Sequence, residues 1–532
     1  MSQLRYTPLE EIDKIHDELK GTFRSGKTKS IAYRKYLLVQ LMYLLHDNVG
    51  RFEDALKADL GRPPLESQLF ETSLSLSEIR NTYSNIDKWV KPETAPFSPT
   101  WSAMRPVILK EPKGVVLVIG PFNYPVFLSV PLVASAIAAG NTVIVKPSEQ
   151  TPATSGLLAE LIHKYLDPSI VRVVNGAIPE TTRLLEKPWG HIMYTGSGKV
   201  GKIVSGAAAK TLTPVTLELG GKSPVFIDPN YDLKAAARRI LWGKVTNAGQ
   251  TCVAPDYIMV TPDLQDRLVQ AFKEVYEEFY STEKGPRDEG AYARLVTPQA
   301  LARVNGLLQN SKGEIVLGGE VDEALKFMAP TIVKNVKPDD SLMSEEIFGP
   351  VLPIMPVRDV DAAIAYVNDN DHPLTLYVFS EDKKFKEKVF SNTLSGSAVA
   401  NETLIVPAVE GLPFGGVGPS GSGYHTGKYG FDTFTHFRAT FDSPKWIDII
   451  FGFRYPPYTS KSIVGLKKVY NVRLPPRPTG PPGPDADAQQ ENLEKWLGWL
   501  KFFIVPAIAG GIFKRDFILQ QLRAIQGWRL AG

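Results

Sequence analysis

The chain of 532 residues contains one cysteine, Cys252. A single cysteine excludes an intramolecular disulfide, so this thiol is either a small buried apolar group or a nucleophile. Asn247, Gly249 and Gln250 precede it and Pro255 follows it, which predicts a polar, turn-forming loop. An inert structural cysteine lies more often within an apolar run. The loop by itself leaves both interpretations open.

A second reactive group, Glu218, lies 34 positions before the thiol. Apolar residues alternate with polar ones over 215–219, and two glycines follow at 220–221. This pattern predicts a strand that ends at a tight turn. Strand ends are frequent positions for catalytic carboxylates in α/β enzymes, but a solvated glutamate is as common there.

The segments LELGGKSP and NAGQTC, in this order, resemble the paired signatures of the aldehyde dehydrogenase superfamily. The resemblance implies that the Cys252 thiolate attacks an aldehyde carbon and becomes a thioester. It implies that Glu218 activates the water that hydrolyses the thioester. It assigns to Asn123, in the segment FNYP, the donation of a hydrogen bond to the oxyanion. Without the resemblance, Asn123 is an ordinary turn residue.

Short apolar runs alternate with helical segments in the region that holds Asn123. The runs are 115–120, 142–147, 171–176 and 191–196, and helices are expected over 130–139 and 154–165. Strands that alternate with helices predict βαβ units and a parallel sheet of the doubly wound, Rossmann-like type. A helical region from about residue 8 to residue 90 precedes this sheet.

A nucleotide site is predicted where the last of these strands meets a helix. Gly196, Ser197 and Gly201 belong to a G-x-G-x-x-G segment that follows the strand and opens the helix, which suits a pyrophosphate. Spacing alone would assign Glu218 to the cofactor ribose. The resemblance instead places the adenosine ribose contacts on Lys146 and Glu149 in KPSE, which would otherwise be read as a surface ion pair.

The segment EIFGP supplies the other cofactor residues. The resemblance implies that Glu346 and Phe348 hold the nicotinamide ribose and ring; without it, the two would be loop and core residues. The expected cofactor is NAD, because a carboxylate at Glu149 accepts a hydrogen bond from a ribose 2′-hydroxyl and repels a 2′-phosphate. NADP stays open, since Lys146 offsets that repulsion. No metal is expected.

Residues 413–438, PFGGVGPSGSGYHTGKYGFDTFTHFR, resemble the closing signature of the class 3 and fatty aldehyde dehydrogenase branch. The resemblance covers about residues 8 to 445. It implies an α/β fold with an NAD-binding domain (1–91 and 111–217), a catalytic domain (218–400) and a small β oligomerisation arm (92–110 and 401–445). A homodimer is expected.

Residues 446–532 are expected to form a Pro-rich linker and a hydrophobic tail. The linker includes PPRPTGPPGP (475–484), and the tail includes WLGWLKFFIVPAIAGGIF (496–513). One interpretation of 496–513 is a helix packed on the protein. We favour a membrane anchor or interfacial insertion, because two tryptophans lie at one end and Lys514 and Arg515 at the other. The amino terminus lacks a signal peptide pattern, so the catalytic body is expected to face the cytosol.

The composition fits a soluble globular enzyme, with 43% hydrophobic residues, 22% charged residues and a net charge of +3. The basic residues are scattered, so no nucleic-acid partner is expected. The predicted function is NAD(P)-dependent oxidation of a long, apolar aldehyde, fatty or apocarotenoid, to the carboxylic acid. The alternatives are an acylating or semialdehyde-type dehydrogenase and a membrane-tethered scaffold without turnover.

Overall fold

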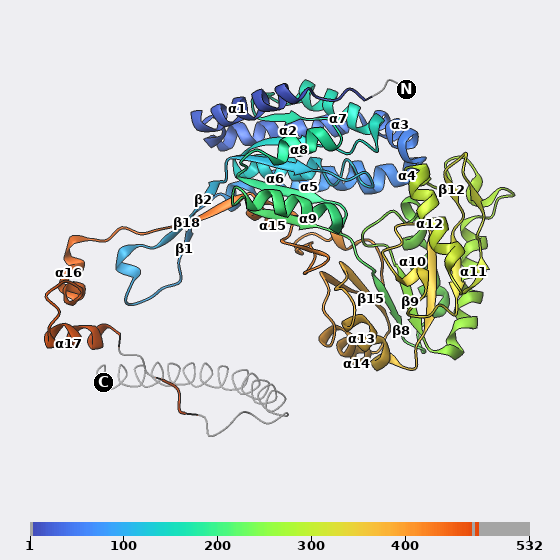
Figure 1. The fold of residues 1–532 in the computed structure, drawn as a ribbon. Helices are drawn as coiled ribbons and strands as arrows, with labels where there is room; N and C mark the ends of the chain where they lie inside the picture. Colours follow the sequence, from blue (N-terminus) through green and yellow to red (C-terminus); the bar gives the residue numbers. More distant parts are fainter. Residues whose placement is uncertain (1–3, 471–473, 478–532) are drawn as a thin grey trace, which may run out of the picture. The chain divides into compact units, whose positions relative to one another are not determined.

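The computed structural model describes residues 4–470 and 474–477. The chain divides into two compact units, Met1–Asp442 and Ser443–Gly532. The first unit holds two large sheets, a three-stranded sheet and a two-stranded one, and every residue predicted for the active site belongs to it (Figure 1).

Five helices open the chain, as the helical pattern before residue 90 predicts: α1 (Leu9–Ser25), α2 (Ile31–His46), α3 (Val49–Leu60), α4 (Pro64–Ser67) and α5 (Leu74–Trp89). Between α4 and α5 the chain forms one π-helical turn, η2 (Gln68–Ser73). Insertions of this kind occur often at functional sites. Helices α2 and α5 pack against each other and against α6 (Val130–Ala139) (Figure 1).

The first large sheet contains the predicted Rossmann-like strands. Its order is β17-β7-β6-β3-β4-β5, and all neighbours from β7 to β5 are parallel. The bounds are β3 (Val115–Ile119), β4 (Thr142–Lys146), β5 (Val171–Val173), β6 (His191–Thr195), β7 (Val215–Glu218) and β17 (Gly421–Ser422). Strands β3, β4, β5 and β6 agree with the predicted runs to within three residues, and β17 was not predicted. The crossover helices are α6, α7 (Pro152–Tyr165), α8 (Ile178–Leu185) and α9 (Gly198–Ala209).

The sequence of this sheet explains its place in the interior. Every residue of β3, β4 and β6 is buried, and β3 and β4 are almost continuously apolar, as parallel strands covered on both faces are. Helix α6 is buried on all sides, which fits its almost uniformly apolar sequence. Separate apolar clusters lie on the two faces of the sheet.

The second large sheet follows in the chain and has the order β10-β13-β14-β9-β8-β15-β16. Its strands are parallel except for β10, which pairs antiparallel with β13. The bounds are β8 (Pro224–Ile227), β9 (Tyr257–Val260), β10 (Glu314–Leu317), β13 (Thr331–Lys334), β14 (Val351–Pro356), β15 (Thr375–Phe379) and β16 (Ser397–Ala400). Helices α10 (Leu233–Val245), α11 (Gln265–Phe279), α12 (Pro298–Asn310), α13 (Val360–Asn368) and α14 (Lys383–Ser391) accompany it. A short hairpin pairs β11 (Val321–Asp322) with β12 (Phe327–Met328).

A small antiparallel sheet joins segments that are distant in the sequence. Its order is β1-β2-β18, with bounds β1 (Glu93–Thr94), β2 (Val107–Pro112) and β18 (Thr435–Thr440). Helix α15 (Gly427–Thr433) precedes β18 and contacts α5 and α6. The domain bounds given above stay a prediction.

The described residues of the second unit form two α-helices, α16 (Asp448–Phe451) and α17 (Ser460–Val469), and two short 3-10 helices, η9 (Lys445–Ile447) and η10 (Gly452–Arg454). The predicted tail segment 496–513 lies outside the described residues. Within 4–470 and 474–477, we find no helix with the length and apolar character needed to cross a bilayer.

Candidate active site

The carboxyl ends of four neighbouring strands bring most of the predicted residues to one edge of the first sheet. Asn123 follows β3, Lys146 is the last residue of β4, Gly196 follows β6 and Glu218 is the last residue of β7. The order of the strands reverses between β3 and β6. Ligands of open α/β sheets bind at this kind of reversal.

The turn that carries Cys252 is held in an unusual backbone conformation. Asn247 and Ala248 have φ values of 54° and 52°, and Gly249 has a φ of 74°. A Cβ atom at Gly249 would lie 2.2 Å from the carbonyl oxygen of Gly349, so only glycine fits. The Asn247 amide nitrogen donates to the carbonyl of Gln250 at 3.1 Å. The predicted loop around Cys252 is confirmed, and its geometry is fixed by these contacts.

Glu218 faces the thiol from the end of β7. Its side chain is 1% exposed, and neither carboxylate oxygen has a partner in hydrogen-bond geometry, although the Cys252 thiol and the Thr195 hydroxyl lie close enough to lower its pKa. Burial outweighs both groups and raises the pKa of Glu218 to about 7. A buried carboxylate without partners, next to a thiol, is arranged to take up a proton.

The thiol has an environment that disfavours its charged form. Burial, followed by the charges of Glu218 and Glu346, raises the pKa of Cys252 well above its ordinary value. The thiolate is therefore scarce in the free protein at neutral pH. Its formation is favoured when Glu218 is protonated, because the nearest negative charge is then absent.

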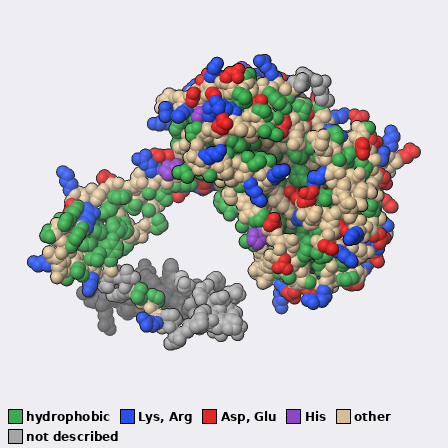
Figure 2. All heavy atoms as spheres, viewed as in Figure 1, with side chains coloured by type: hydrophobic (Ala, Val, Ile, Leu, Met, Phe, Trp, Pro, Cys, Tyr) green, Lys and Arg blue, Asp and Glu red, His purple; other side chains and the backbone are tan. Residues whose placement is uncertain are grey.

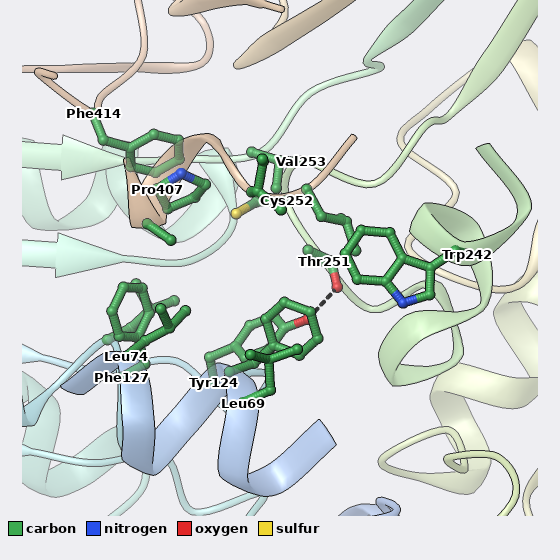
Figure 3. Close-up of a pocket in the computed structure, with 15 residues that line it drawn as sticks. Leu69, Leu74, Tyr124, Phe127, Trp242, Thr251, Cys252, Val253, Pro407 and Phe414 are labelled. Atoms are coloured by element: carbon green, nitrogen blue, oxygen red, sulfur yellow. Dashed lines mark hydrogen bonds between the residues drawn. The ribbon is translucent and has the colours of Figure 1, made fainter. Parts of the chain in front are cut away.

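Cys252 lies on the wall of an apolar cavity of about 110 Å³. Figure 3 shows its sulfur pointing into the space between Phe414 and Pro407 on one side and the loop after β3 on the other. The lining is otherwise almost entirely apolar and comes from η2, α5, the loop after β3, α10 and residues 404–414. Its aromatic members include Phe70, Tyr124, Phe127, Trp242 and Phe414.

Asn123 is 4% exposed and belongs to the loop that forms one wall of this cavity. Its carbonyl oxygen accepts hydrogen bonds from the Arg62 guanidinium and from the Asn247 amide, the latter at 3.0 Å. The next residue, Tyr124, makes a 2.7 Å hydrogen bond between its hydroxyl and that of Thr251, drawn in Figure 3. The loop after β3 is thus connected to the segment of the thiol at two points, the Asn123 carbonyl and the Tyr124 hydroxyl.

Lys146 and Glu149, the residues predicted to hold the adenosine ribose, form an ion pair with each other. The alternative interpretation, an ordinary surface ion pair, predicts the same contact. The Lys146 ammonium donates to the Glu149 carboxylate at 2.8 Å, with Lys146 buried and Glu149 about one third exposed. At the end of β6, a Cβ atom at Gly196 would lie 2.4 Å from the Tyr194 hydroxyl oxygen. Ser197 caps α9 by accepting from the backbone N–H of Val200. A Cβ atom at Gly198 would meet nothing within 4 Å, so the first residue of α9 leaves room for an anion.

Glu346 and Phe348 approach the same edge from the second sheet. A Cβ atom added at Gly220 would lie 2.0 Å from a Glu346 carboxylate oxygen. The carboxylate therefore occupies space that is free only because residue 220 is glycine. Burial raises the pKa of Glu346 to about 8. Phe348 has a φ of 46° and packs edge to face on Phe122 with ring centroids 5.8 Å apart. Glu346 therefore lies against the turn that follows β7, and Phe348 lies against the loop after β3.

These residues fit a dinucleotide. The helix start at Gly198 has open space around it. A Cβ atom added at Gly201 would lie 3.0 Å from the Leu219 side chain, so the glycine lets α9 pack closely there. The buried Thr195 hydroxyl, next to Gly196, has no partner in hydrogen-bond geometry and lies near Glu218. Glycines at a strand-to-helix turn, with open space at the start of the helix, match the needs of a pyrophosphate.

Several residues at the site were missed by the sequence analysis. Trp242 and Phe414 line the cavity, and β17 pairs with β7 so that Gly421 is opposite Glu218. Arg62 and Glu71, both fully buried, contact the loop of Asn123. Two charged residues in an otherwise helical, amphipathic region give no signal of their own in the sequence.

Comparisons with known proteins agree with this geometry. The sequence profile described as the aldehyde dehydrogenase family matches residues 2–440. Aldehyde dehydrogenase family 3 member A2 of Mus musculus is 43% identical over 496 residues, which are 93% of this chain and 98% of the mouse protein. The dimeric, NADP-preferring aldehyde dehydrogenase of Rattus norvegicus is 44% identical over 456 residues, 85% of this chain and 99% of the rat protein.

A solved structure is also similar. The substrate-bound state of Staphylococcus aureus AldH superimposes with a TM-score of 0.83 at 38% identity, covering 86% of this chain and 99% of that chain. The predicted fold class is therefore confirmed.

Proposed function

Because the chain belongs to the aldehyde dehydrogenase family, we propose that it oxidises a long, apolar aldehyde to the carboxylic acid with NAD or NADP. The observation that supports this substrate is the apolar cavity that ends at Cys252. A polar or charged aldehyde would lose hydration there without gaining partners, whereas an alkyl chain gains about 0.8 kcal/mol for each buried CH₂.

Cys252 is the nucleophile of the first half of the reaction. Its thiolate forms a bond to the aldehyde carbon, and the carbonyl oxygen becomes an oxyanion. The Asn123 amide and the backbone N–H of Cys252 donate hydrogen bonds to this oxygen. The bound nicotinamide ring supplies the hydride acceptor, and the carbon attached to Cys252 is left as a thioester.

Glu218 acts in the second half of the reaction. With a pKa of about 7 it is part ionised near neutral pH, so it can take a proton from a water molecule that attacks the thioester. The carboxylic acid leaves and Cys252 recovers its proton. The presence of Glu218 beside the thiol favours hydrolysis of the thioester. An acylating dehydrogenase would instead transfer the acyl group to another acceptor.

The remaining predicted residues hold the cofactor in this proposal. Lys146 and Glu149 take the adenosine ribose, Gly196, Ser197 and Gly201 make space for the pyrophosphate, and Glu346 and Phe348 take the nicotinamide ribose and ring. The rat relative is named NADP-preferring, which supports keeping NADP beside NAD.

The experiment is NADH or NADPH formation by the purified protein with saturated aldehydes from three to twenty carbons. We expect kcat/KM to rise with chain length, in steps of up to about fourfold for each added CH₂ that is buried. Equal values across the series would contradict the assignment of an apolar substrate. Absence of turnover with every aldehyde, in a folded protein, would favour the scaffold alternative.

Membrane association is the second part of the proposal. In the described residues of the second unit, large apolar and aromatic side chains are exposed, among them Ile449 at 87% and Tyr458 at 77%. Figure 2 shows hydrophobic side chains gathered over the part of the second unit that contains α16 and α17. Residues 443–470 contain Lys445, Arg454, Lys461, Lys467 and Lys468 but one acidic residue, Asp448. Apolar, aromatic and basic groups together suit a lipid surface.

The similarity to the mouse protein covers 93% of this chain, so it continues past the family match that ends at residue 440. We place the catalytic body on the cytosolic side and the tail 496–513 in the membrane. A chain that ends at residue 474 is expected to remain folded, oxidise short aldehydes and lose sedimentation with vesicles. Sedimentation that does not change on truncation would contradict the proposed role of the tail.

A homodimer is the third part. The name of the rat relative includes the word dimeric. Strand β18 lies at the edge of its sheet and carries Phe437, 43% exposed, and Phe441 follows it at 68% exposed. Covering such an edge avoids unpaired backbone groups. Light scattering with size exclusion tests the dimer, and Phe437→Ser is expected to shift it towards monomer.

A further inference from the structure

We infer that the buried ion pair of Arg62 and Glu71 is a positioning device for the reaction, because it sets the loop that carries the oxyanion donor Asn123. The inference rests on the proposed function. Both side chains are 0% exposed, and the Arg62 guanidinium donates to a Glu71 carboxylate oxygen at 2.6 Å.

Arg62 connects three parts of the site. One terminal nitrogen bonds Glu71, and the other donates to the carbonyl oxygen of Asn123. Its Nε donates to the Asn247 side-chain oxygen at 3.2 Å, and its guanidinium lies over the Tyr124 ring, 4.8 Å from the centroid. A planar guanidinium thus fixes the distance between the Asn123 loop and the turn that precedes Cys252.

Glu71 holds the other end of the same loop. Its second carboxylate oxygen accepts from the backbone N–H groups of Val126 and Phe127, at 3.0 and 2.7 Å. The pair therefore bonds the loop at residue 123 from one side and at residues 126 and 127 from the other. Residues between these points can shift little without breaking a buried, charge-assisted hydrogen bond.

The pair also connects the loop to the wall of the substrate cavity. Glu71 belongs to the π-helical turn η2, and its neighbours Leu69 and Phe70 line the cavity. Tyr124 and Phe127 of the loop line it as well, with the Phe70 and Tyr124 rings 6.2 Å apart. The same ion pair thereby fixes the oxyanion donor and the apolar residues that hold the aldehyde.

A role limited to stability does not explain this arrangement. Taking two charges out of water costs several kcal/mol for each ion, and apolar residues of similar size often stabilise a protein as well. Apart from the bond between the two side chains, the side-chain hydrogen bonds of this pair go to the Asn123 loop or to the turn before Cys252. We conclude that the pair positions the Asn123 amide for the developing oxyanion.

The test is a double-mutant cycle between Arg62→Lys and Asn123→Ala in the full chain. Lysine keeps the charge but not the planar fork. We expect Arg62→Lys to lower kcat/KM for aldehyde oxidation by about 10- to 100-fold, since a small displacement of a catalytic group has an effect of this size. If Arg62 acts through Asn123, the same change in the Asn123→Ala background lowers kcat/KM less than about threefold.

Two further measurements separate positioning from general damage. Alkylation of Cys252 by iodoacetamide needs no oxyanion donor, so its rate is expected to change less than threefold in Arg62→Lys. The matched control is Arg34→Lys, because Arg34 is also buried and also donates to backbone carbonyls, those of Thr28 and Ala138, away from the cavity. Arg34→Lys is expected to lower Tm without changing kcat/KM.

The inference would be overturned if the kcat/KM losses of Arg62→Lys and Asn123→Ala multiplied in the double variant. Equal losses of kcat/KM in Arg34→Lys and Arg62→Lys would overturn it as well. If Arg62→Lys does not fold, the cycle is measured with Arg62→Gln combined with Glu71→Gln, which removes both charges at once. If neither form folds while Asn123→Ala does, the pair is structural and the inference is wrong. An Asn123→Ala variant with unchanged turnover would instead refute the role of Asn123 in the proposed function.

Discussion

Replacing Glu218 by glutamine is expected to change the pH dependence of stability by an amount that the structure predicts. The pKa of Glu218 is raised from 4.5 to about 7 by burial. When a carboxyl group has a higher pKa in the folded protein than in the unfolded one, its full contribution to the free energy of unfolding is present at pH values below the unfolded pKa. That contribution is lost as the pH rises through the folded pKa. The wild-type protein therefore loses stability from this group between about pH 4.5 and pH 7.

The size of the loss follows from 1.36 kcal/mol for each pKa unit. Two and a half units correspond to about 3 kcal/mol in total, of which about 2 kcal/mol falls between pH 5.5 and pH 8. Glutamine does not ionise, so its own burial cost is the same at both pH values. We therefore compare the free energies of unfolding of Glu218→Gln and wild type. From pH 5.5 to pH 8, the value of the variant minus that of wild type is expected to increase by about 2 kcal/mol.

Urea unfolding, followed by tryptophan fluorescence at both pH values, measures this difference. Glu149→Gln is a suitable control, because its carboxylate is about one third exposed and paired with Lys146. A difference for Glu218→Gln that is the same at both pH values would refute the raised pKa.

The same variant is expected to slow hydrolysis of the thioester more than hydride transfer. A burst of NADH close to one equivalent should then precede a slow steady state, whereas wild-type turnover should rise with pH through about 7. Loss of the burst together with the steady state would show that Glu218 acts before the thioester forms.

Three further predictions concern other residues. Cys252→Ala is expected to abolish aldehyde oxidation and leave NADH binding, measured by fluorescence, within about threefold of wild type, because the proposed cofactor residues lie elsewhere; substantial turnover would end the mechanism. Glu149→Gln should raise the ratio of kcat/KM for NADP to that for NAD by about five- to tenfold, which corresponds to about 1 kcal/mol of repulsion at a partly exposed site; an unchanged ratio would remove Glu149 from the ribose site. Ala408→Trp fills part of the cavity wall and should raise KM for long aldehydes at least tenfold with little effect on propanal, whereas equal effects on both would place the alkyl chain elsewhere.

The sequence alone was sufficient for features that depend on short stretches of chain. Alternating apolar runs and helical segments predict β3, β4 and β6 with the helices between them, because side-chain burial repeats with the period of each element. The turn around Cys252 and the strand end at Glu218 follow from local composition in the same way. The resemblance of LELGGKSP and NAGQTC to a known family then led to the predicted reaction, and the comparisons confirm that family.

Tertiary structure decided everything that depends on residues far apart in the chain. Glu218 has a pKa of about 7 because the surrounding fold excludes water, and a sequence carries no direct record of burial at a strand end. Strand β17 pairs with β7 although about 200 residues separate them in the chain, and this pairing places Gly421 opposite Glu218. Phe414, from the same part of the chain as β17, lines the cavity. Arg62 lies 61 residues from Asn123 and 185 residues from Asn247 in the chain, and such contacts have no periodicity because they are fixed by the fold as a whole.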